Sequence, residues 1–443
     1  MIARLRSLWL SVNASYWFYP ALFSVNAFFL SFITIWLDRN GAAEWLGQFS
    51  WIQPSRPEGA RTVLTVIAGS MIGVASTVFS ITIAAVAYAS GNYGPRLLTN
   101  FMEDKGNQLS LGVFIATFVY AVMVLRVVRG EDERAASAAD AAATTLPGFT
   151  PQLSLLVATA MAIWAVAVLV YFLHHIPASI RINTVLKGIG ARFVAHVRWR
   201  YTEEHEERDP PQQIEGETVT ATANGYVKII DFATLDNLAE EHGAQIALQL
   251  RTGDFVHSNV PLVEIKGCEL TDELAAEIRE CFATGAMRTA TQDLEYLIDE
   301  LVEIALRALS PGINDPFTAI TSLHWLGAGT AELARRDLDR GPEQDSYDRE
   351  RVQPLDDDFE HFLRRGFGAI RASAATSAMT SKKFLDALLS VARACRSHKR
   401  RNVLLAEGLQ LLEQAKLELK GPSLEELQVQ FDEFAAAMEA LGV

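Results

Sequence analysis

The stretch TVLTVIAGSMIGVASTVFSITIAAVAYAS, from Thr62 to Ser90, decides the fold class of this chain. A helix needs about 20 mostly apolar residues to cross the hydrocarbon core of a bilayer. This stretch exceeds that length and contains no charged residue. It therefore predicts a transmembrane helix that extends past the bilayer toward Arg96.

Three further stretches of this kind lie nearby, at Trp17–Leu37, Leu109–Val128 and Leu153–Ile176. Together they predict a four-helix transmembrane domain over residues 16–180, preceded by a short segment, 1–15. Tyr16 and Trp36 lie where aromatic anchors at the membrane interface are expected. The first stretch is too long for a signal peptide, and no small-residue cleavage site follows it.

Lysine and arginine residues near the helix ends predict the orientation. Arg4 and Arg6 precede the first helix, and five basic residues lie between Arg181 and Arg200, after the fourth. Both flanks are therefore expected to be cytoplasmic, with the acidic loop 130–150 outside. Arg39, Arg56, Arg61, Arg126 and Arg129 oppose this assignment, because they fall on the predicted outer side.

The second helix carries small and hydroxyl-bearing residues every three or four positions, a spacing that puts them on one face. The members are Thr62, Thr65, Gly69, Gly73, Ser76, Ser80, Ala84, Ala87 and Gly91, with Ser70 and Thr77 beside them. Such a stripe allows close packing between helices in lipid. It can also line a water-filled path, in which hydroxyls replace part of the hydration of an ion.

No Asp, Glu or Lys lies inside the four predicted spans. Coupled carriers usually place an ionisable residue at the site that binds the coupling ion, so this absence disfavours a carrier. His174 and His175 are the nearest candidates, at the inner end of the fourth helix. Paired histidines at such a position are more often structural, and a pH-sensing role is the alternative.

After the fourth span, a helical connector is expected over residues 181–212, continuing the membrane helix despite Pro177. A small β-rich module follows over 213–268, with strands between Thr218 and Ile265 and a short helix that Gly243 ends. The run GDFVHSNVPLVEI, from Gly253 to Ile265, is similar to small barrels of the biotinyl-carrier type. Those carriers modify a lysine in an exposed hairpin, and no lysine lies in such a turn here.

Residues 269–443 are expected to form a helical cytoplasmic domain. Thr289 with Gln292 predicts a capping box at the start of one helix. Asp315 is expected to cap the next helix, with Pro316 in its first position. Asn314 and Asp315 could also form a polar site at this helix junction, and capping alone is the simpler interpretation.

A basic cluster stands out in a chain whose formal net charge is −14. Its members are Arg393, Arg396, His398, Lys399, Arg400 and Arg401. Contact with an anionic inner leaflet is one interpretation, and a solvated helix end is the other. The overall acidity argues against general binding to nucleic acid.

Neither enzyme motifs nor ligand-spaced cysteines are present. Cys268, Cys281 and Cys395 are widely spaced, so they predict neither a disulfide framework nor a metal site. The sequence lacks the phosphate-loop, dinucleotide, zinc-protease and serine-hydrolase motifs. We therefore expect no catalytic activity, no metal and no cofactor. The predicted fold class is a mainly α membrane protein, with a four-helix transmembrane bundle and a cytoplasmic α+β domain containing a barrel-like module and a helical bundle.

Three stretches carry a resemblance to a known family. They are NYGPRLLTNFMEDKGNQLSLGVFIATFVYAVMVLR (Asn92 to Arg126), PQLSLLVATAMAIWAVAVLVYFLHHI (Pro151 to Ile176) and LVEIALRALSPGINDPFTAI (Leu301 to Ile320). In them the chain resembles the bacterial predicted-membrane-protein family known as domain of unknown function 2254. The resemblance implies a bacterial inner-membrane location and carries over no functional residue.

The leading hypothesis is an oligomeric channel or pore that inorganic ions cross, since symmetric assembly turns one polar stripe per chain into a path. Thr65, Gly69, Gly73, Ser76, Thr77 and Ser80 would line it. Arg96, Glu103, Asp104 and Lys105 would ring its cytoplasmic mouth, and the cytoplasmic domain would gate or filter it. The competing hypothesis is a non-conducting scaffold or sensor, whose cytoplasmic domain binds a partner or ligand.

Overall fold

The computed structural model describes residues 9, 12–13, 15–41, 55–94, 101–102, 104–130, 148–203, 214–338, 347–355 and 358–442. The chain divides into two compact units. One comprises residues 11–91 and 95–180, and we call it the membrane unit. The other consists mainly of residues 181–443, and we call it the C-terminal unit.

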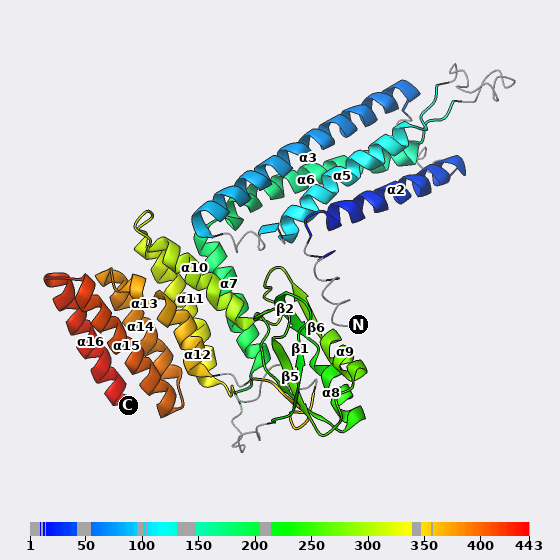
Figure 1. The fold of residues 1–443 in the computed structure, drawn as a ribbon. Helices are drawn as coiled ribbons and strands as arrows, with labels where there is room; N and C mark the ends of the chain where they lie inside the picture. Colours follow the sequence, from blue (N-terminus) through cyan, green and yellow to red (C-terminus); the bar gives the residue numbers. More distant parts are fainter. Residues whose placement is uncertain are drawn as a thin grey trace. The chain divides into compact units, whose positions relative to one another are not determined.

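The membrane unit contains the four expected apolar helices, α2 (Phe18–Arg39), α3 (Pro57–Tyr93), α5 (Lys105–Leu125) and α6 (Gln152–Ser179) (Figure 1). All four are long and apolar enough to cross a membrane. Helix α5 is the most buried of them and lies against both α2 and α6. Leu64, Phe114, Tyr120 and Phe172 lie in the core that the helices share. The prediction of four apolar helices long enough to cross a membrane is confirmed.

The first turn of α6 is held by the end of α2. Asp38 accepts hydrogen bonds from the Leu153 and Ser154 backbone N–H groups, at 2.8 and 2.9 Å, and from the Ser154 hydroxyl at 2.6 Å. The Thr34 and Tyr120 hydroxyls lie 2.8 Å apart in the same region. The two backbone bonds to Asp38 satisfy donors that every helix leaves unpaired at its N-terminus.

The expected continuous helix after the fourth span is interrupted. Helix α6 contains Pro177 and ends at Ser179, and α7 (Ile182–Arg200) starts after Arg181, whose backbone is extended. Proline lacks an N–H, so it removes a hydrogen bond from the last turns of α6. The connector is therefore a separate helix rather than an extension of α6.

The β-rich part of the C-terminal unit forms two sheets. The strands are β1 (Glu217–Thr220), β2 (Gly225–Ile230), β3 (Gln245–Leu248), β4 (Phe255–Val256), β5 (Pro261–Lys266), β6 (Phe282–Gly285) and β7 (Val352–Gln353). Their orders are β1-β5-β3-β7 and β4-β2-β6, and only the β3–β7 pair is parallel. The described strands close no barrel, so the barrel-like shape is not confirmed.

Two of these strands lie outside the range in which strands were expected. Strand β6 follows helix α9 (Asp272–Glu280) and pairs with β2, while β7 reaches β3 from far along the chain. Helix α8 (Phe232–His242) ends at Gly243, whose φ of 59° lies in the left-handed region that favours glycine, as expected. Arg351, just before β7, donates to both carboxylate oxygens of Asp236 on α8, at 2.7 and 2.9 Å.

The rest of the C-terminal unit is helical (Figure 1). Its helices are α10 (Leu294–Ala308), α11 (Pro316–Arg335), α12 (Phe359–Leu363), the π-helical turn η2 (Arg364–Gly368), α13 (Ala369–Ala374), α14 (Ala378–Ala394), α15 (His398–Glu418) and α16 (Pro422–Ala440). The predicted capping box at Thr289 and Gln292 is wrong. Asp293 caps α10, and the Gln292 amide instead bonds the N–H and C=O groups of Ile230.

Helices α7 and α11 approach closely because each offers a glycine to an aromatic ring of the other. A Cβ atom added to Gly329 would overlap the ring of Phe193, and one added to Gly190 would overlap Trp325. Phe193 is fully buried. The contact therefore depends on two glycines that helix propensity alone would disfavour.

We expect Gly329→Ala to destabilise the protein by about 1–3 kcal/mol, because the added methyl group overpacks a closed contact. Gly327→Ala is the matched control on the same helix, where an added Cβ would meet ordinary van der Waals contacts at 3.6 Å or more. Thermal unfolding of the full chain in detergent measures both. Equal stability of the two variants would contradict the proposed ring-into-glycine contact.

The Arg351 guanidinium lowers the pKa of the Asp236 carboxyl, chiefly through its hydrogen bonds. A carboxyl whose pKa is depressed in the folded state adds stability above its unfolded pKa, near about 3.9, and loses it as the pH falls through the folded value. Asp236→Asn should therefore cost about 1 kcal/mol at pH 7 and progressively less below about pH 4. Thermal melts across this range test it, with exposed Asp432→Asn as the control. A pH-independent difference would contradict the assignment.

Candidate functional site

The small-residue face of α3 points away from the core of the membrane unit. Thr65, Gly69, Gly73, Ser76, Thr77 and Ser80 are all exposed. The buried face lies opposite and combines larger residues, including Leu64, Met71 and Val78, with alanines. A Cβ atom added to Gly69 or Gly73 would have no neighbour within 4 Å. Within the described residues, the stripe therefore packs against no other helix of the same chain.

Two hydroxyls of this face bond to the backbone of their own helix. Thr77 donates to the Gly73 carbonyl at 3.1 Å, and Ser80 donates to the Ser76 carbonyl at 2.9 Å. A hydroxyl has one hydrogen and two lone pairs. In this arrangement the hydrogens are used inside the helix, and oxygen lone pairs remain on the exposed side.

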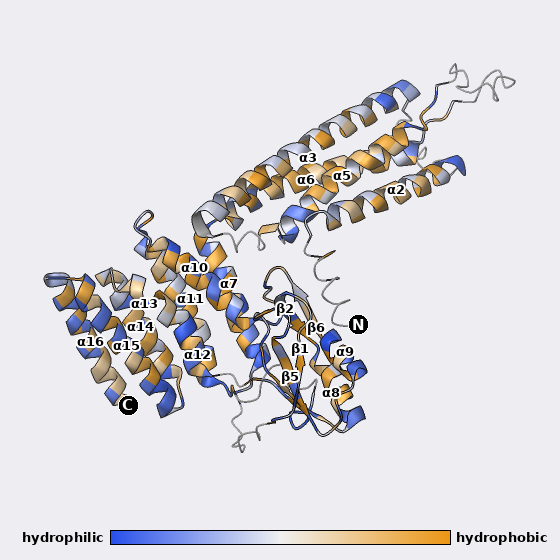
Figure 2. Cartoon of the chain, in the orientation of Figure 1, coloured by the Kyte–Doolittle hydropathy of each residue, from blue (hydrophilic) through white to orange (hydrophobic). Residues whose placement is uncertain are grey.

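Large apolar side chains dominate the outward faces of the neighbouring helices, whereas α3 combines such side chains with its stripe of small residues. Phe28, Phe29 and Trp36 are exposed on α2, and Ile163 and Trp164 are exposed on α6. Large apolar side chains suit contact with lipid, whereas small residues mark contacts between helices. Figure 2 shows this contrast as strongly apolar turns along α6 and paler turns along α3. The α3 stripe is thus an unusual surface to present to lipid.

Two of the predicted mouth residues are held by contacts inside the membrane unit. Asp104 caps α5, accepting from the Asn107 N–H, and lies 2.9 Å from the His175 imidazole. Lys105 donates to the Asn13 carbonyl at 2.7 Å and lies over the ring of Tyr19. Arg96 and Glu103 lie outside the described residues. The mouth assignment remains a prediction.

The His175 ring is half-buried and contacts partners on two helices. Tyr171 stacks on it and its hydroxyl lies 3.2 Å from Nδ1, while Asp104 lies at Nε2. A Cβ atom added to Gly106 would overlap the same ring. This geometry agrees with a structural role for His175, joining α6 to the start of α5.

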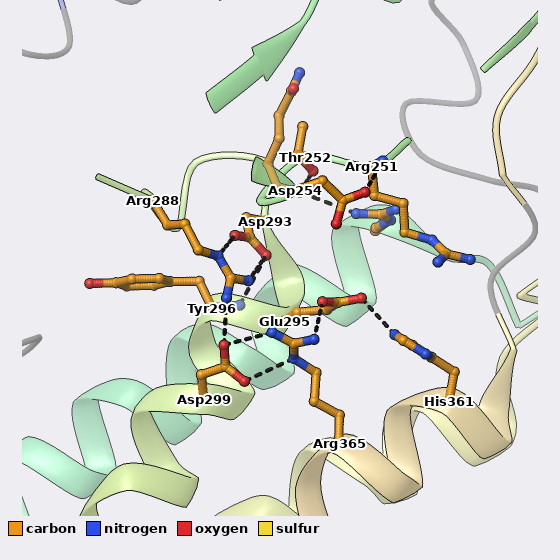
Figure 3. Close-up of polar contacts among 12 residues, drawn as sticks. Arg251, Thr252, Asp254, Arg288, Asp293, Glu295, Tyr296, Asp299, His361 and Arg365 are labelled. Atoms are coloured by element: carbon orange, nitrogen blue, oxygen red, sulfur yellow. Dashed lines mark hydrogen bonds and ion pairs between the residues drawn. The ribbon is translucent and has the colours of Figure 1, made fainter. Parts of the chain in front are cut away.

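The C-terminal unit contains a buried ion network that sequence reasoning missed (Figure 3). Arg288 donates to both carboxylate oxygens of Asp293, at 2.7 and 2.9 Å, and to Asp299 at 2.5 Å. Asp293 is 2% exposed. Burial raises the pKa of the Asp293 carboxyl, and the ion pair with Arg288 opposes this shift. Arginine pairing is the usual requirement for a carboxylate in such a place.

The network continues onto the helices that follow. Arg365, in the π-helical turn η2, donates to both oxygens of Asp299 at 2.8 Å and lies 2.7 Å from Glu295. His361 on α12 lies 2.7 Å from the same Glu295 (Figure 3). Because α10, α12 and η2 share these ions, the network orients the helices against one another. Asp293 could have been found from sequence as a preferred N-cap residue directly before an amphipathic helix.

Asp315 caps α11 as expected. Its carboxylate accepts from the Thr318 N–H at 3.1 Å and from the Thr318 hydroxyl at 2.6 Å. Asn314 adopts a φ of 49°, in the left-handed region that asparagine tolerates. The capping interpretation accounts for these bonds, and a polar binding role for the pair stays a prediction.

No group of three or more His, Cys, Asp or Glu side chains in the described part of the chain could hold a metal ion. The three cysteines are free. Burial raises the pKa of Cys281 to about 12 and that of Cys395 to about 11. Both thiols are therefore poor nucleophiles at neutral pH.

The comparisons with known proteins find relatives and a family model, and none of their descriptions names an activity. The uncharacterized proteins Rv1290c of Mycobacterium tuberculosis and Mb1321c of Mycobacterium bovis are each 30% identical to this chain over 361 residues. The matches cover 78% of this chain and 66% of each relative, so just under two thirds of each relative's length is spanned. No solved structure matches. A family model described as a predicted membrane protein matches residues 13–390, and the chain therefore belongs to the DUF2254 family.

Proposed function

We propose that this membrane protein is a non-enzymatic, homo-oligomeric pore in which the outward faces of α3 from several copies surround an ion path. The observation that carries this proposal is the exposed face with Gly69, Gly73, Ser76, Thr77 and Ser80. These five residues are small or carry a hydroxyl, and they are turned away from the bundle of their own chain. A symmetric ring of such faces would enclose a path lined by hydroxyl groups.

The hydroxyl geometry favours cations in such a path. Thr77 and Ser80 donate their hydrogens to backbone carbonyls, so their oxygens face outward with free lone pairs. Oxygen lone pairs can replace part of the hydration shell of a cation. Large apolar residues such as Ile72 and Phe79 are exposed on the flank of the stripe, where they would seal contacts between copies.

We place both termini in the cytoplasm of a bacterium, with the C-terminal unit as the gate or filter. The arginines that oppose this orientation are partly accounted for by contacts in the membrane unit. Arg61 donates to the Val128 carbonyl at 2.9 Å, and Arg39 lies over the Phe149 ring. These two arginines make contacts within the membrane unit at the predicted outer end. They are therefore weaker evidence for the orientation than arginines without such contacts.

A second function fits the same face. If the glycines bring copies of α3 into dry contact, the stripe is an assembly surface and the chain is a scaffold or sensor. A cationic cavity in the C-terminal unit, described below, favours this alternative because a sensor needs a ligand site. The two functions differ in whether the assembled protein conducts.

Reconstitution in a planar bilayer tests the pore. Wild-type protein is expected to give discrete openings, and Ser76→Phe or Ser80→Phe should abolish them, because a ring of phenylalanines would fill the path. Ile163→Phe, on the exposed apolar face of α6 that suits contact with lipid, is the matched control and should keep its conductance. Lipid-embedded crosslinking of Ser76→Cys reports assembly independently of current.

Unchanged conductance in both serine variants would place the path elsewhere and overturn the α3 assignment. A silent bilayer, with crosslinked and folded protein, would favour the scaffold or sensor. If the protein neither conducts nor crosslinks, the proposal that it forms an oligomer is wrong.

A further inference from the structure

A cavity of about 360 Å³ lies in the C-terminal unit, between the end of α11 and the beginnings of α12 and α15. Five basic side chains line it, Arg335 and Arg336 from α11 and Arg396, Lys399 and Arg400 from the α15 side. Its size falls within the usual range of small-molecule sites, about 300–1,000 Å³. Residues about 60 positions apart in the sequence thus converge on one hollow.

Three of these arginines are held in place by structural bonds. Arg400 donates to the carbonyls of Leu333, Ala334 and Arg336. These carbonyls lie at the C-terminal end of α11. Arg335 and Arg336 both contact the Glu203 carboxylate. A cation that is fixed before a ligand arrives loses little entropy on binding, so this part of the site is preorganised.

The other two cations face the cavity without a carboxylate. Arg396 and Lys399 are exposed, and no carboxylate of the described residues lies within ion-pair distance of either. The two acids that line the cavity bond to groups other than Arg396 and Lys399. Asp358 caps α12, and Glu360 pairs with Arg364. The five basic side chains therefore outnumber the two acidic ones in the lining, which gives the cavity an excess of positive charge in a chain whose net charge is −14.

The start of α15 adds to this imbalance. His398, Lys399 and Arg400 occupy its first turn, where acidic residues are normally preferred, and the Ser397 side chain makes no capping bond. Basic residues here oppose the positive end of the helix dipole. An anion in the cavity would offset the positive charge of these side chains and of the helix end.

A second hollow, of about 300 Å³, shares Glu360, Lys399 and Val403 with the first. Its other polar lining residues are the uncharged Asn402 and Gln410 and the oppositely charged Arg364 and Glu407. The combined groove thus has a strongly cationic end and a more neutral polar end. This asymmetry suits a molecule with an anionic group at one end and a neutral polar body.

We infer that this groove binds a small phosphorylated molecule, with its phosphate group among Arg335, Arg336, Arg396, Lys399 and Arg400. Guanidinium groups match the geometry of phosphate oxygens and bond them in pairs. The inference does not depend on whether α3 forms a pore. The phosphate could belong to a free metabolite or to a lipid headgroup, and the experiment separates these sources.

The test uses the full chain in nanodiscs of neutral phosphatidylcholine, titrated with inorganic pyrophosphate and with ATP. Saturable binding of at least one probe by calorimetry is expected, weakening as salt is added. The double variant Arg396→Gln/Lys399→Gln should bind at least tenfold more weakly. Both positions are exposed, so the variant is expected to fold. Arg393→Gln is the matched control, an exposed arginine nearby that does not line the groove, and it should bind like wild type.

Nanodiscs that contain phosphatidylglycerol form the second arm. A rise in unfolding temperature there, lost in the double variant and accompanied by weaker pyrophosphate binding, would identify lipid as the phosphate source. Pyrophosphate or ATP binding that is equal in both bilayers would identify a soluble ligand. The inference is overturned if neither arm shows an effect that depends on Arg396 and Lys399, or if Arg393→Gln loses as much binding as the double variant.

Discussion

Hydrocarbon offers no hydrogen bond, and this constraint determines how polar groups are arranged in the membrane unit. Asp38 illustrates it at the end of the bundle, where one carboxylate satisfies two backbone donors and a hydroxyl of α6. Thr77 and Ser80 illustrate it on α3, where each hydroxyl returns its hydrogen to a carbonyl one turn earlier. Polar side chains are tolerated because the protein itself supplies their partners.

A second helix could pack on the α3 face for two reasons, to satisfy hydrogen-bond donors or to fill space. Since its hydroxyl hydrogens are already bonded, the need to satisfy donors does not force another helix against it. Shape is the stronger argument, because Gly69 and Gly73 present no side chain beside the exposed Ile72 and Phe79. Small residues let the backbone of a second helix approach closely, and association in bilayers is driven by packing of this kind.

The sequence predicts the membrane helices well because length and apolarity are local properties. Asp315 and Gly243 were found for the same reason, as each acts on its own helix. Strand β7 could not be found, because Val352–Gln353 is too short to show a period and exists only through pairing with β3. The capping box failed because Gln292 is taken up by Ile230, a partner about 60 residues away.

The ion network and the cationic groove were missed in the same way. The sequence shows the basic residues near Arg396, but it does not show that Arg335 and Arg336 join them across a cavity. Nor does it show that Arg288 and Arg365 both reach Asp299. Charged groups separated along the chain become a site only when packing brings them together. The periodicity of a sequence reports local helices and strands, and it does not report such long-range contacts.

Helix α12 links these two charged regions of the C-terminal unit. Phe359 and Glu360 line the groove at its start, and His361 pairs with Glu295 one residue later. The π-helical turn that follows places Arg365 against Asp299, and an inserted residue of this kind shifts the side chains after it around the helix. Buried ion pairs contribute little net stability because desolvation offsets their attraction, but breaking one is costly. The network therefore acts mainly to fix the position of α12, and with it one wall of the groove.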